Sequence, residues 1–170
     1  MKIAITGPES SGKTTFANAL AKKLEGTFIP EFAREYLGAL SREYTQDDLD
    51  RIATGQIQYW YANAEKPILV CDTEMLVMHI WSEVRFNSTS NFILEALEKQ
   101  SFDHYFLCSP DIPWEEDPLR EHPEMRFQLF DIYLEKLEVL NLPFTILNGT
   151  ESERLEKALY DLGKCGWIHT

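Results

Sequence analysis

The segment that most constrains this chain runs from Gly7 to Thr14 and reads GPESSGKT. It matches the phosphate-loop pattern G-x-x-x-x-G-K-[ST] at every defined position. An apolar run at residues 2–6 precedes it, and an amphipathic helical pattern over 13–25 follows it. Glycines let the backbone curl so that successive N–H groups point at an anion, and the helix N-terminus adds a positive dipole end. The chain is therefore expected to hold a phosphate-binding loop between a strand and a helix.

The residue types in this loop suit a nucleoside triphosphate bound with Mg²⁺. Lys13 would reach the terminal phosphates, and the Thr14 hydroxyl would bind the metal ion. The loop alone allows either ATP or GTP, although a GTP-binding switch would also carry an N-K-x-D segment, which the sequence lacks. The alternative is a glycine-rich turn with an accidental Lys-Thr pair. The residues predicted to bind ATP are Gly7, Glu9, Ser10, Ser11, Gly12, Lys13, Thr14 and Thr15.

Strand and helix patterns alternate along the whole chain. This alternation predicts an α/β fold with a five-stranded, mainly parallel sheet and helices on both faces. We expect a single domain over residues 1–170, because no linker divides it. The strands are expected at 2–6, 27–30, 67–71, 103–108 and 143–147, and the helices at 13–25, 45–65, 74–85, 89–100, 123–140 and 151–163.

Charge and composition narrow the class of partner. The formal net charge is -12, which argues against broad nucleic-acid binding but leaves room for a locally basic phosphate pocket. No apolar run approaches the ~20 residues that cross a bilayer, and Gly7-Pro8 interrupts any signal-peptide core. The three cysteines and four histidines lie too far apart for a zinc site or a disulfide framework. A cytoplasmic protein with a small-molecule substrate is expected.

Two acidic residues follow the third predicted strand. Asp72 ends the run PILVCD and resembles a Walker B aspartate, which helps to hold the metal ion. The alternative is that Asp72 only forms a turn. Glu74 lies two positions further on and could share the metal role.

The segment after the second predicted strand carries a candidate catalytic carboxylate. Residues beyond the carboxyl ends of parallel strands converge on the ligand crevice. Glu31 would there accept the proton of a substrate hydroxyl, and Arg34 would bind substrate or transferring phosphoryl charge. The alternative is a Glu-rich helix N-terminus with Arg34 as a surface partner.

The loop at residues 109–122, here called the lid loop, is long enough to be functional. It carries Arg120, and Arg126 follows it. Arginines on such a loop would close over the phosphates, exclude water and add positive charge to the transition state. Trp114 is either a hydrophobic anchor or a stacking surface for a flat substrate ring.

Four blocks together resemble a known family. They are ITGPESSGKTT at 5–15, PEFAREYL at 30–37, ILVCDTE at 68–74 and SPDIPWEEDPLR at 109–120. The chain resembles, over nearly its whole length, the P-loop kinase domain of NadR-type proteins, which phosphorylate nicotinamide riboside. The resemblance implies a fold like that of nucleoside monophosphate kinases, with sheet order 2-3-1-4-5, and Mg·ATP as phosphate donor.

Full-length NadR-type proteins carry an adenylyltransferase domain ahead of the kinase. We expect this chain to be a stand-alone kinase without room for that domain, so that its product would be the mononucleotide.

The resemblance also implies roles for individual residues. The implied catalytic residues are Lys13, Glu31, Asp72, Arg120 and Arg126, with Thr14 and Asp72 at the metal ion. The residues expected at the substrate are Glu31, Arg34, Asp72 and Trp114.

Three functions remain open at this point. The first is a kinase acting on the 5′-hydroxyl of nicotinamide riboside in NAD biosynthesis. The second is a kinase for a (deoxy)nucleoside or a nucleotide, with the same machinery. The third is a regulatory P-loop ATPase that acts through partner binding. The aromatic candidates for holding a substrate ring are Trp60, Tyr61, Trp81 and Trp114. The sequence does not determine the oligomeric state.

Overall fold

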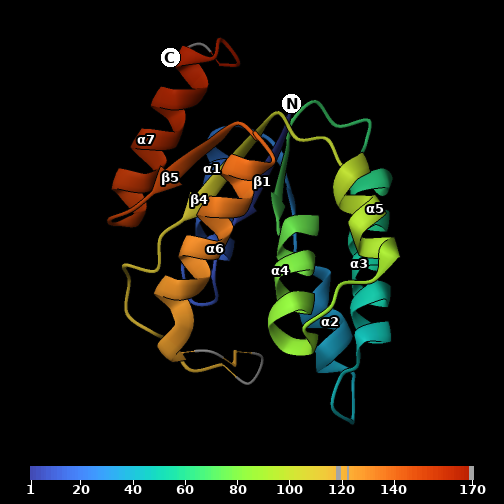
Figure 1. The fold of residues 1–170 in the computed structure, drawn as a ribbon. Helices are drawn as coiled ribbons and strands as arrows, with labels where there is room; N and C mark the ends of the chain where they lie inside the picture. Colours follow the sequence, from blue (N-terminus) through green and yellow to red (C-terminus); the bar gives the residue numbers. More distant parts are fainter. Residues whose placement is uncertain (118–119, 122, 169–170) are drawn as a thin grey trace.

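A five-stranded parallel sheet forms the centre of this protein (Figure 1). The computed structural model describes residues 1–117, 120–121 and 123–168. The sheet order is β2-β3-β1-β4-β5, as expected. The strands are β1 (Lys2–Thr6), β2 (Thr27–Ile29), β3 (Leu69–Asp72), β4 (His104–Cys108) and β5 (Phe144–Leu147).

Both faces of the sheet are covered, and the strand sequences explain why. In β1, Ile3 and Ile5 face one hydrophobic cluster while Ala4 faces the other. In β4, Tyr105 points to the same side as Ala4, and Phe106 points to the opposite side. Successive side chains of a strand alternate between faces, so a strand buried on both sides reads as a continuous apolar run.

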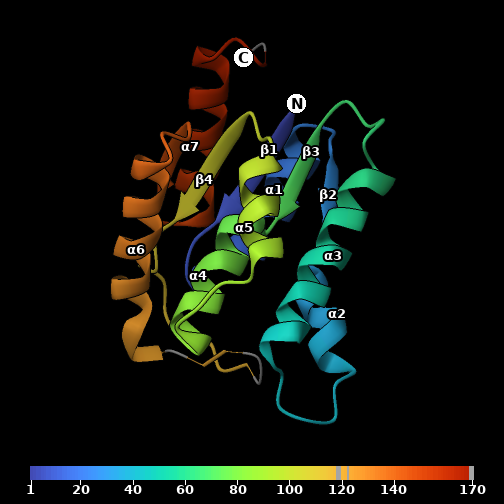
Figure 2. The same ribbon diagram turned by 45° about the vertical axis from the view of Figure 1, so that its right-hand side comes forward.

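Helices α1 and α7 cover one face, and helices α2 to α6 cover the other (Figure 2). The prediction of helices on both sides is confirmed. The helices are α1 (Lys13–Lys23), α2 (Phe32–Gly38), α3 (Gln46–Ala62), α4 (Met75–Phe86), α5 (Asn91–Lys99), α6 (Arg126–Val139) and α7 (Glu151–Lys164).

Local sequence signals explain where several helices start and stop. Thr45 forms a capping box with Asp48 at the start of α3. Asn87 adopts a left-handed conformation that ends α4. The Ser90 side chain then accepts a hydrogen bond from the backbone N–H of Ile93 and begins α5.

Two elements differ from the sequence-based expectation. Residues 32–38 form helix α2, which is not among the helices expected from the sequence patterns. The start of this helix at Phe32 agrees with the alternative interpretation of the segment as a helix N-terminus. The helix expected at 123–140 begins with a 3₁₀ turn, η1 (Pro123–Met125), and becomes α-helical at Arg126.

Pro118, Leu119 and His122 of the lid loop lie outside the described residues. Within the described part of the chain, no helix combines the length and apolar character needed to cross a bilayer.

Candidate active site

The predicted phosphate loop connects β1 to α1, and its glycines are required by geometry. Gly7 has a φ of 129°, and a Cβ atom there would lie 2.7 Å from the Cys108 carbonyl oxygen. Gly12 caps α1 with a φ of 80°. Any residue with a side chain would be strained at both positions. The loop therefore packs closely against the end of β4, with the N-terminus of α1 at its far end.

Several carbonyl groups of this loop are bound by side chains. The Pro8 carbonyl accepts hydrogen bonds from the Ser11 hydroxyl and from the Lys13 amine, each at 2.8 Å. The Ser10 carbonyl accepts one from Arg126 at 3.1 Å. In a trans peptide the N–H points opposite to the carbonyl. The N–H of the residue after each bound carbonyl therefore points away from the side chain that binds that carbonyl. Lys13 lies along its own loop, and this loop lines a cleft that also includes Glu31 and Arg34.

Asp72 ends β3 beside this loop and is fully buried. Neither carboxylate oxygen has a hydrogen-bond partner among the described residues. Burial raises the pKa of Asp72, while the nearby Thr14 hydroxyl and the positive charges of Lys13 and Arg34 act in the opposite direction. A buried pair of free oxygen ligands next to a phosphate loop fits Mg²⁺, which prefers hard oxygen donors and needs few protein ligands. The donor set therefore fits the ion that the fold implies.

Glu74 does not share this arrangement, which corrects the suggestion made from its spacing. Thr73 between the two acids has a φ of 87°. Glu74 is fully buried, where it accepts hydrogen bonds from the Thr6 hydroxyl, the Leu76 backbone N–H and the Gln100 amide. Its carboxylate caps α4 and holds neighbouring elements together, so its oxygens are already occupied, unlike those of Asp72.

Glu31 is the N-terminal flanking residue of α2 and lines the cleft together with the phosphate loop. Burial is the main cause that raises the pKa of Glu31, and the charge of Asp72 raises it further. The Arg34 guanidinium lies 3.8 Å from Glu31 and 2.9 Å from Asp117 of the lid loop. The structure thus brings Glu31, Arg34 and Asp72 together, as the strand-end argument predicts.

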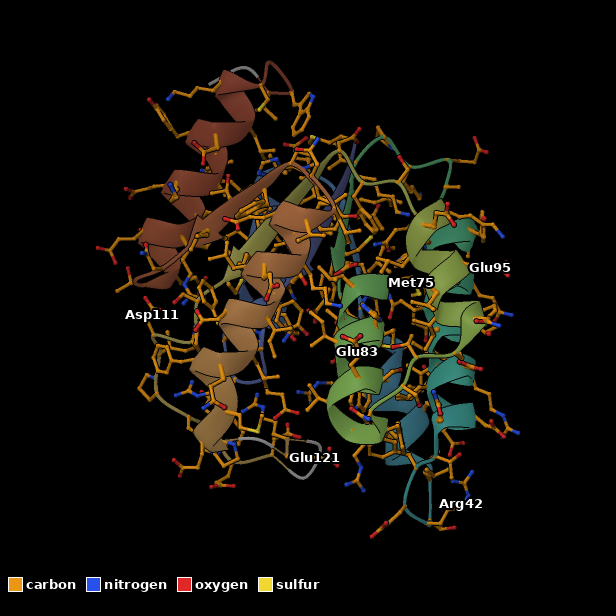
Figure 3. The ribbon with its side chains drawn as sticks, viewed as in Figure 1. Arg42, Met75, Glu83, Glu95, Asp111 and Glu121 are labelled. Carbon is orange, nitrogen blue, oxygen red and sulfur yellow. The ribbon has the colours of Figure 1, made fainter. Side chains whose placement is uncertain are left out.

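The lid loop contacts the phosphate loop through Ser10. The Ser10 hydroxyl accepts hydrogen bonds from the Glu115 backbone N–H at 3.0 Å and from Arg120 at 3.4 Å. The Glu121 backbone N–H donates to Glu9. Figure 3 shows Glu121 near the ends of α4 and α6. Arg120 contacts the Ser10 hydroxyl and Arg126 contacts the Ser10 carbonyl, so both predicted arginines lie at the phosphate loop.

Trp114 supports the arginines instead of facing the cleft. Its ring centroid lies 6.0 Å from the Arg120 guanidinium and 5.6 Å from that of Arg126. Trp114 is not among the described residues that line the cleft. This geometry favours the interpretation of Trp114 as an anchor, with cation–π contacts to both arginines.

The part of the cleft beyond Glu31 is apolar and aromatic. Trp81 lines it, and the indole N–H of Trp81 donates to the Tyr44 hydroxyl at 3.0 Å. The other proposed ring-binding residues lie elsewhere: Trp60 is buried against Phe102 and Tyr61 is exposed. The apolar wall of the cleft consists of Ala33, Leu37, Val77, Ile80, Trp81, Val84, Leu129 and Tyr133.

Sequence reasoning missed the aromatic residue Tyr133 and the arginine Arg154. Tyr133 is buried on α6 and lines the same cleft as the phosphate loop. Arg154 is buried on α7, where its NH1 atom donates to the Ser11 carbonyl at 2.6 Å. A signal for Arg154 exists in the sequence, because it shares a helical face with the buried residues Ala158 and Leu162. A charged residue on an apolar helical face is a candidate for a specific buried contact.

The fold and this site define a P-loop domain with the architecture of small-molecule kinases. The chain belongs to the AAA domain family AAA_28, whose model matches residues 2–154. It is similar to the "Trifunctional NAD biosynthesis/regulator protein NadR" of Escherichia coli (strain K12), with 29% identity over 170 residues. That match covers 94% of this chain and 39% of the relative. The NadR protein of Salmonella typhimurium is 31% identical over 127 residues, which cover 69% of this chain and 30% of that protein.

Solved structures agree with this assignment of the fold. A crystal structure of NadR in complex with NAD and AMP-PNP matches with a TM-score of 0.78 at 21% identity, over 99% of this chain and 50% of that one. A deoxyadenosine kinase from M. mycoides matches with a TM-score of 0.70 at 17% identity, over 96% of this chain and 100% of that one. The resemblance to NadR-type proteins is confirmed, and the chain spans less than half the length of the curated relatives it matches.

Proposed function

We propose that this chain is an ATP-dependent kinase that phosphorylates the 5′-hydroxyl of nicotinamide riboside to the mononucleotide in NAD biosynthesis. The observation that carries the proposal is the position of Glu31. It lines one cleft together with the phosphate loop and the apolar wall that contains Trp81. A hydroxyl held by Glu31 would thus share this cleft with a phosphate site and a ring-binding surface. NadR has also been solved in complex with NR, which supports this choice of acceptor.

The chemical step needs a base and a positively charged environment. Glu31 accepts the proton of the 5′-hydroxyl while that oxygen forms a bond to the γ-phosphorus of ATP. The bond between this phosphorus and the bridging oxygen breaks, and ADP leaves. Lys13, Arg120 and Arg126 balance the charge on the transferring group. The raised pKa of Glu31 makes it a stronger base than an exposed glutamate.

Thr14 and Asp72 are the residues that would hold Mg²⁺. When bound, the ion neutralises phosphate charge and orients the phosphates for in-line transfer. The unpartnered, buried carboxylate of Asp72 supports this role.

Arg34 would bind the acceptor or the transferring group beside Glu31. We also propose that the protein acts in the cytoplasm on small molecules and binds no nucleic acid, consistent with its net charge of -12.

A second candidate keeps the mechanism and changes the acceptor to a nucleoside or deoxynucleoside. The match to a deoxyadenosine kinase over its whole length supports it. The first candidate is favoured by the similarity in sequence to NadR, a protein that has been solved in complex with NR. A regulatory ATPase is favoured less, because Glu31 and the ring-binding wall share one cleft.

The test is Mg·ATP consumption with and without nicotinamide riboside, beside a panel of nucleosides, with the product identified by mass. Strong stimulation by the riboside with a mononucleotide product supports the proposal. Stimulation by another nucleoside would transfer the assignment to the second candidate. Lys13→Ala serves as the inactive control and is expected to abolish nucleotide-dependent turnover. Intact ATP binding without stimulation by any acceptor would point to the regulatory ATPase.

A further inference from the structure

Arg154 joins three loops at the nucleotide side of the sheet. Its side chain is 3% exposed, although it lies on the outer helix α7. Nε donates to the Gly149 carbonyl at 3.0 Å, NH1 to the Ser11 carbonyl at 2.6 Å and NH2 to the Ser109 carbonyl at 2.9 Å. NH2 also pairs with the Asp111 carboxylate. Figure 3 shows Asp111 beside the N-terminal end of α7.

These partners come from the segments that follow β1, β4 and β5. Asp111 closes the arrangement, since it also accepts a hydrogen bond from the Gly149 backbone N–H at 2.6 Å. The planar fork of an arginine can reach several acceptors at defined angles, which a lysine amine on a flexible stem does not reproduce. One side chain thus ties the phosphate loop, the base of the lid loop and the start of α7 together.

The bond to Ser11 has a direct consequence for phosphate binding. The Ser11 carbonyl points at Arg154, so the N–H of Gly12 in the same trans peptide points the opposite way. The guanidinium also lies in contact range of Gly12, because a Cβ built there would be 3.4 Å from its NH1 atom. Gly12 and its neighbours line the cleft. The orientation of a phosphate-binding amide is therefore coupled to a residue on the last helix.

A packing role alone does not explain this arginine. Ala158 and Leu162, one and two turns further along the same face of α7, are apolar and buried. A methionine at position 154 would fill similar space without the cost of removing a charge from water. The charged fork instead donates hydrogen bonds to three backbone carbonyls next to the nucleotide site.

We propose that Arg154 is a positioning residue for nucleotide binding, which holds the Ser11–Gly12 peptide in its phosphate-binding orientation and keeps the base of the lid loop in register with it. The proposal rests on the proposed function only in that the loop binds ATP. It does not depend on the identity of the acceptor.

The test measures the Kd of Mg·ATP without any acceptor for Arg154→Lys and Arg154→Met. Both variants are expected to bind ATP roughly tenfold or more weakly, the loss that one or two unpaired buried groups produce. Lys157→Met removes an exposed positive charge from the same helix and should leave the Kd unchanged. Circular dichroism and thermal unfolding establish that each variant is folded.

Hydrogen exchange of the phosphate-loop amides adds a readout that a purely structural role would not change. Exchange at Gly12 should speed up in folded Arg154→Lys and stay unchanged in Lys157→Met. Asp111→Asn removes one partner of the guanidinium and should weaken ATP binding by a smaller factor than the Arg154 variants do. It replaces those variants as the test if they do not fold. A folded Arg154→Lys or Asp111→Asn protein with wild-type Kd and exchange would overturn the proposal. Absence of riboside turnover with weakened ATP binding would instead refute only the choice of acceptor.

Discussion

The guanidinium of Arg34 lies 2.9 Å from the carboxylate of Asp117 and so connects helix α2 to the lid loop. The same guanidinium lies 3.8 Å from Glu31, the proposed base. One side chain is therefore shared between a loop over the nucleotide site and the residue that would activate the acceptor. The position of the loop and the charge around Glu31 are linked through Arg34.

The first prediction concerns this ion pair. Asp117→Asn should lower kcat/KM roughly two- to fivefold, because a partly exposed pair contributes ~0.5–1 kcal/mol and Arg34 would lose its restraint beside Glu31. The free energy of unfolding should change by less than about 1 kcal/mol. Glu95→Gln breaks an exposed ion pair with Lys99 far from the site and is the control. Equal kcat/KM for the two variants would disprove the link.

The second prediction tests Glu31 as the base. Glu31→Gln keeps the shape of the side chain and removes its ability to accept a proton, so kcat should fall by about 100-fold or more. The Kd of ATP should stay within about threefold. Glu35→Gln on the exposed side of the same helix is the matched control. Near wild-type kcat in Glu31→Gln would show that another group takes the proton.

The third prediction follows from the direction of the pKa shift of Glu31. Its ordinary pKa is near 4.5, and burial together with Asp72 raises it. The base is active when deprotonated, so kcat/KM should fall on acidification at a pH clearly above 4.5. The measurement is the acid limb of the kcat/KM profile, supported by carbon NMR titration of the Glu31 carboxyl. An acid limb with its midpoint at or below pH 4.5, the ordinary pKa of a glutamate, would contradict the assignment.

The fourth prediction is that Asp72→Asn stabilises the nucleotide-free protein while it abolishes Mg²⁺-dependent turnover. Burying a neutral polar group without hydrogen bonds costs about 1–3 kcal/mol and burying a charge costs more, so an isosteric amide reduces the cost. Lys13 and Arg34 keep other partners, at Pro8 and Asp117. The Tm should rise by about 2–4 °C for each kcal/mol.

The pH dependence of this gain has a defined sign. A raised pKa in the folded state means that the stability contribution of Asp72 is present below its ordinary value of 3.8 and is lost as pH rises through the raised pKa. The difference in Tm between Asp72→Asn and the wild type should therefore be largest near neutral pH and vanish in acid. Asp131→Asn, on the exposed side of α6, is the control. A lower Tm for Asp72→Asn at neutral pH would refute the prediction.

The fifth prediction concerns the ring-binding wall. Trp81→Ala should raise the KM of the acceptor roughly tenfold, the usual cost of losing one stacking surface, without changing the Kd of ATP. Trp81→Phe keeps a ring but loses the N–H that donates to Tyr44, so its effect should be smaller. Tyr61→Ala, an exposed residue outside this cleft, is the control. An unchanged acceptor KM in Trp81→Ala would remove Trp81 from the substrate site.

Much of the fold and part of the site could be predicted because their signals are local. The phosphate loop needs glycines at positions with positive φ, and Gly7 and Gly12 supply them. Strand-end positions led to Glu31 and Asp72 because parallel strands bring their carboxyl ends to one edge. Spacing misled in the case of Glu74. Thr73 has positive φ, and Glu74 is buried in hydrogen bonds that cap α4.

The order of elements, the phosphate loop and the strand-end acids could be predicted from the sequence, since each depends on neighbouring residues or on the two-residue and 3.6-residue periods of strands and helices. Long-range packing is needed to know which aromatic residue faces the cleft and what Arg154 binds. Trp81 and Trp60 both lie on apolar helical faces, but only the packing of α4 against α6 places Trp81 at the site. Contacts between residues 143 positions apart, such as Arg154 and Ser11, arise from the path of the whole chain and leave no local pattern.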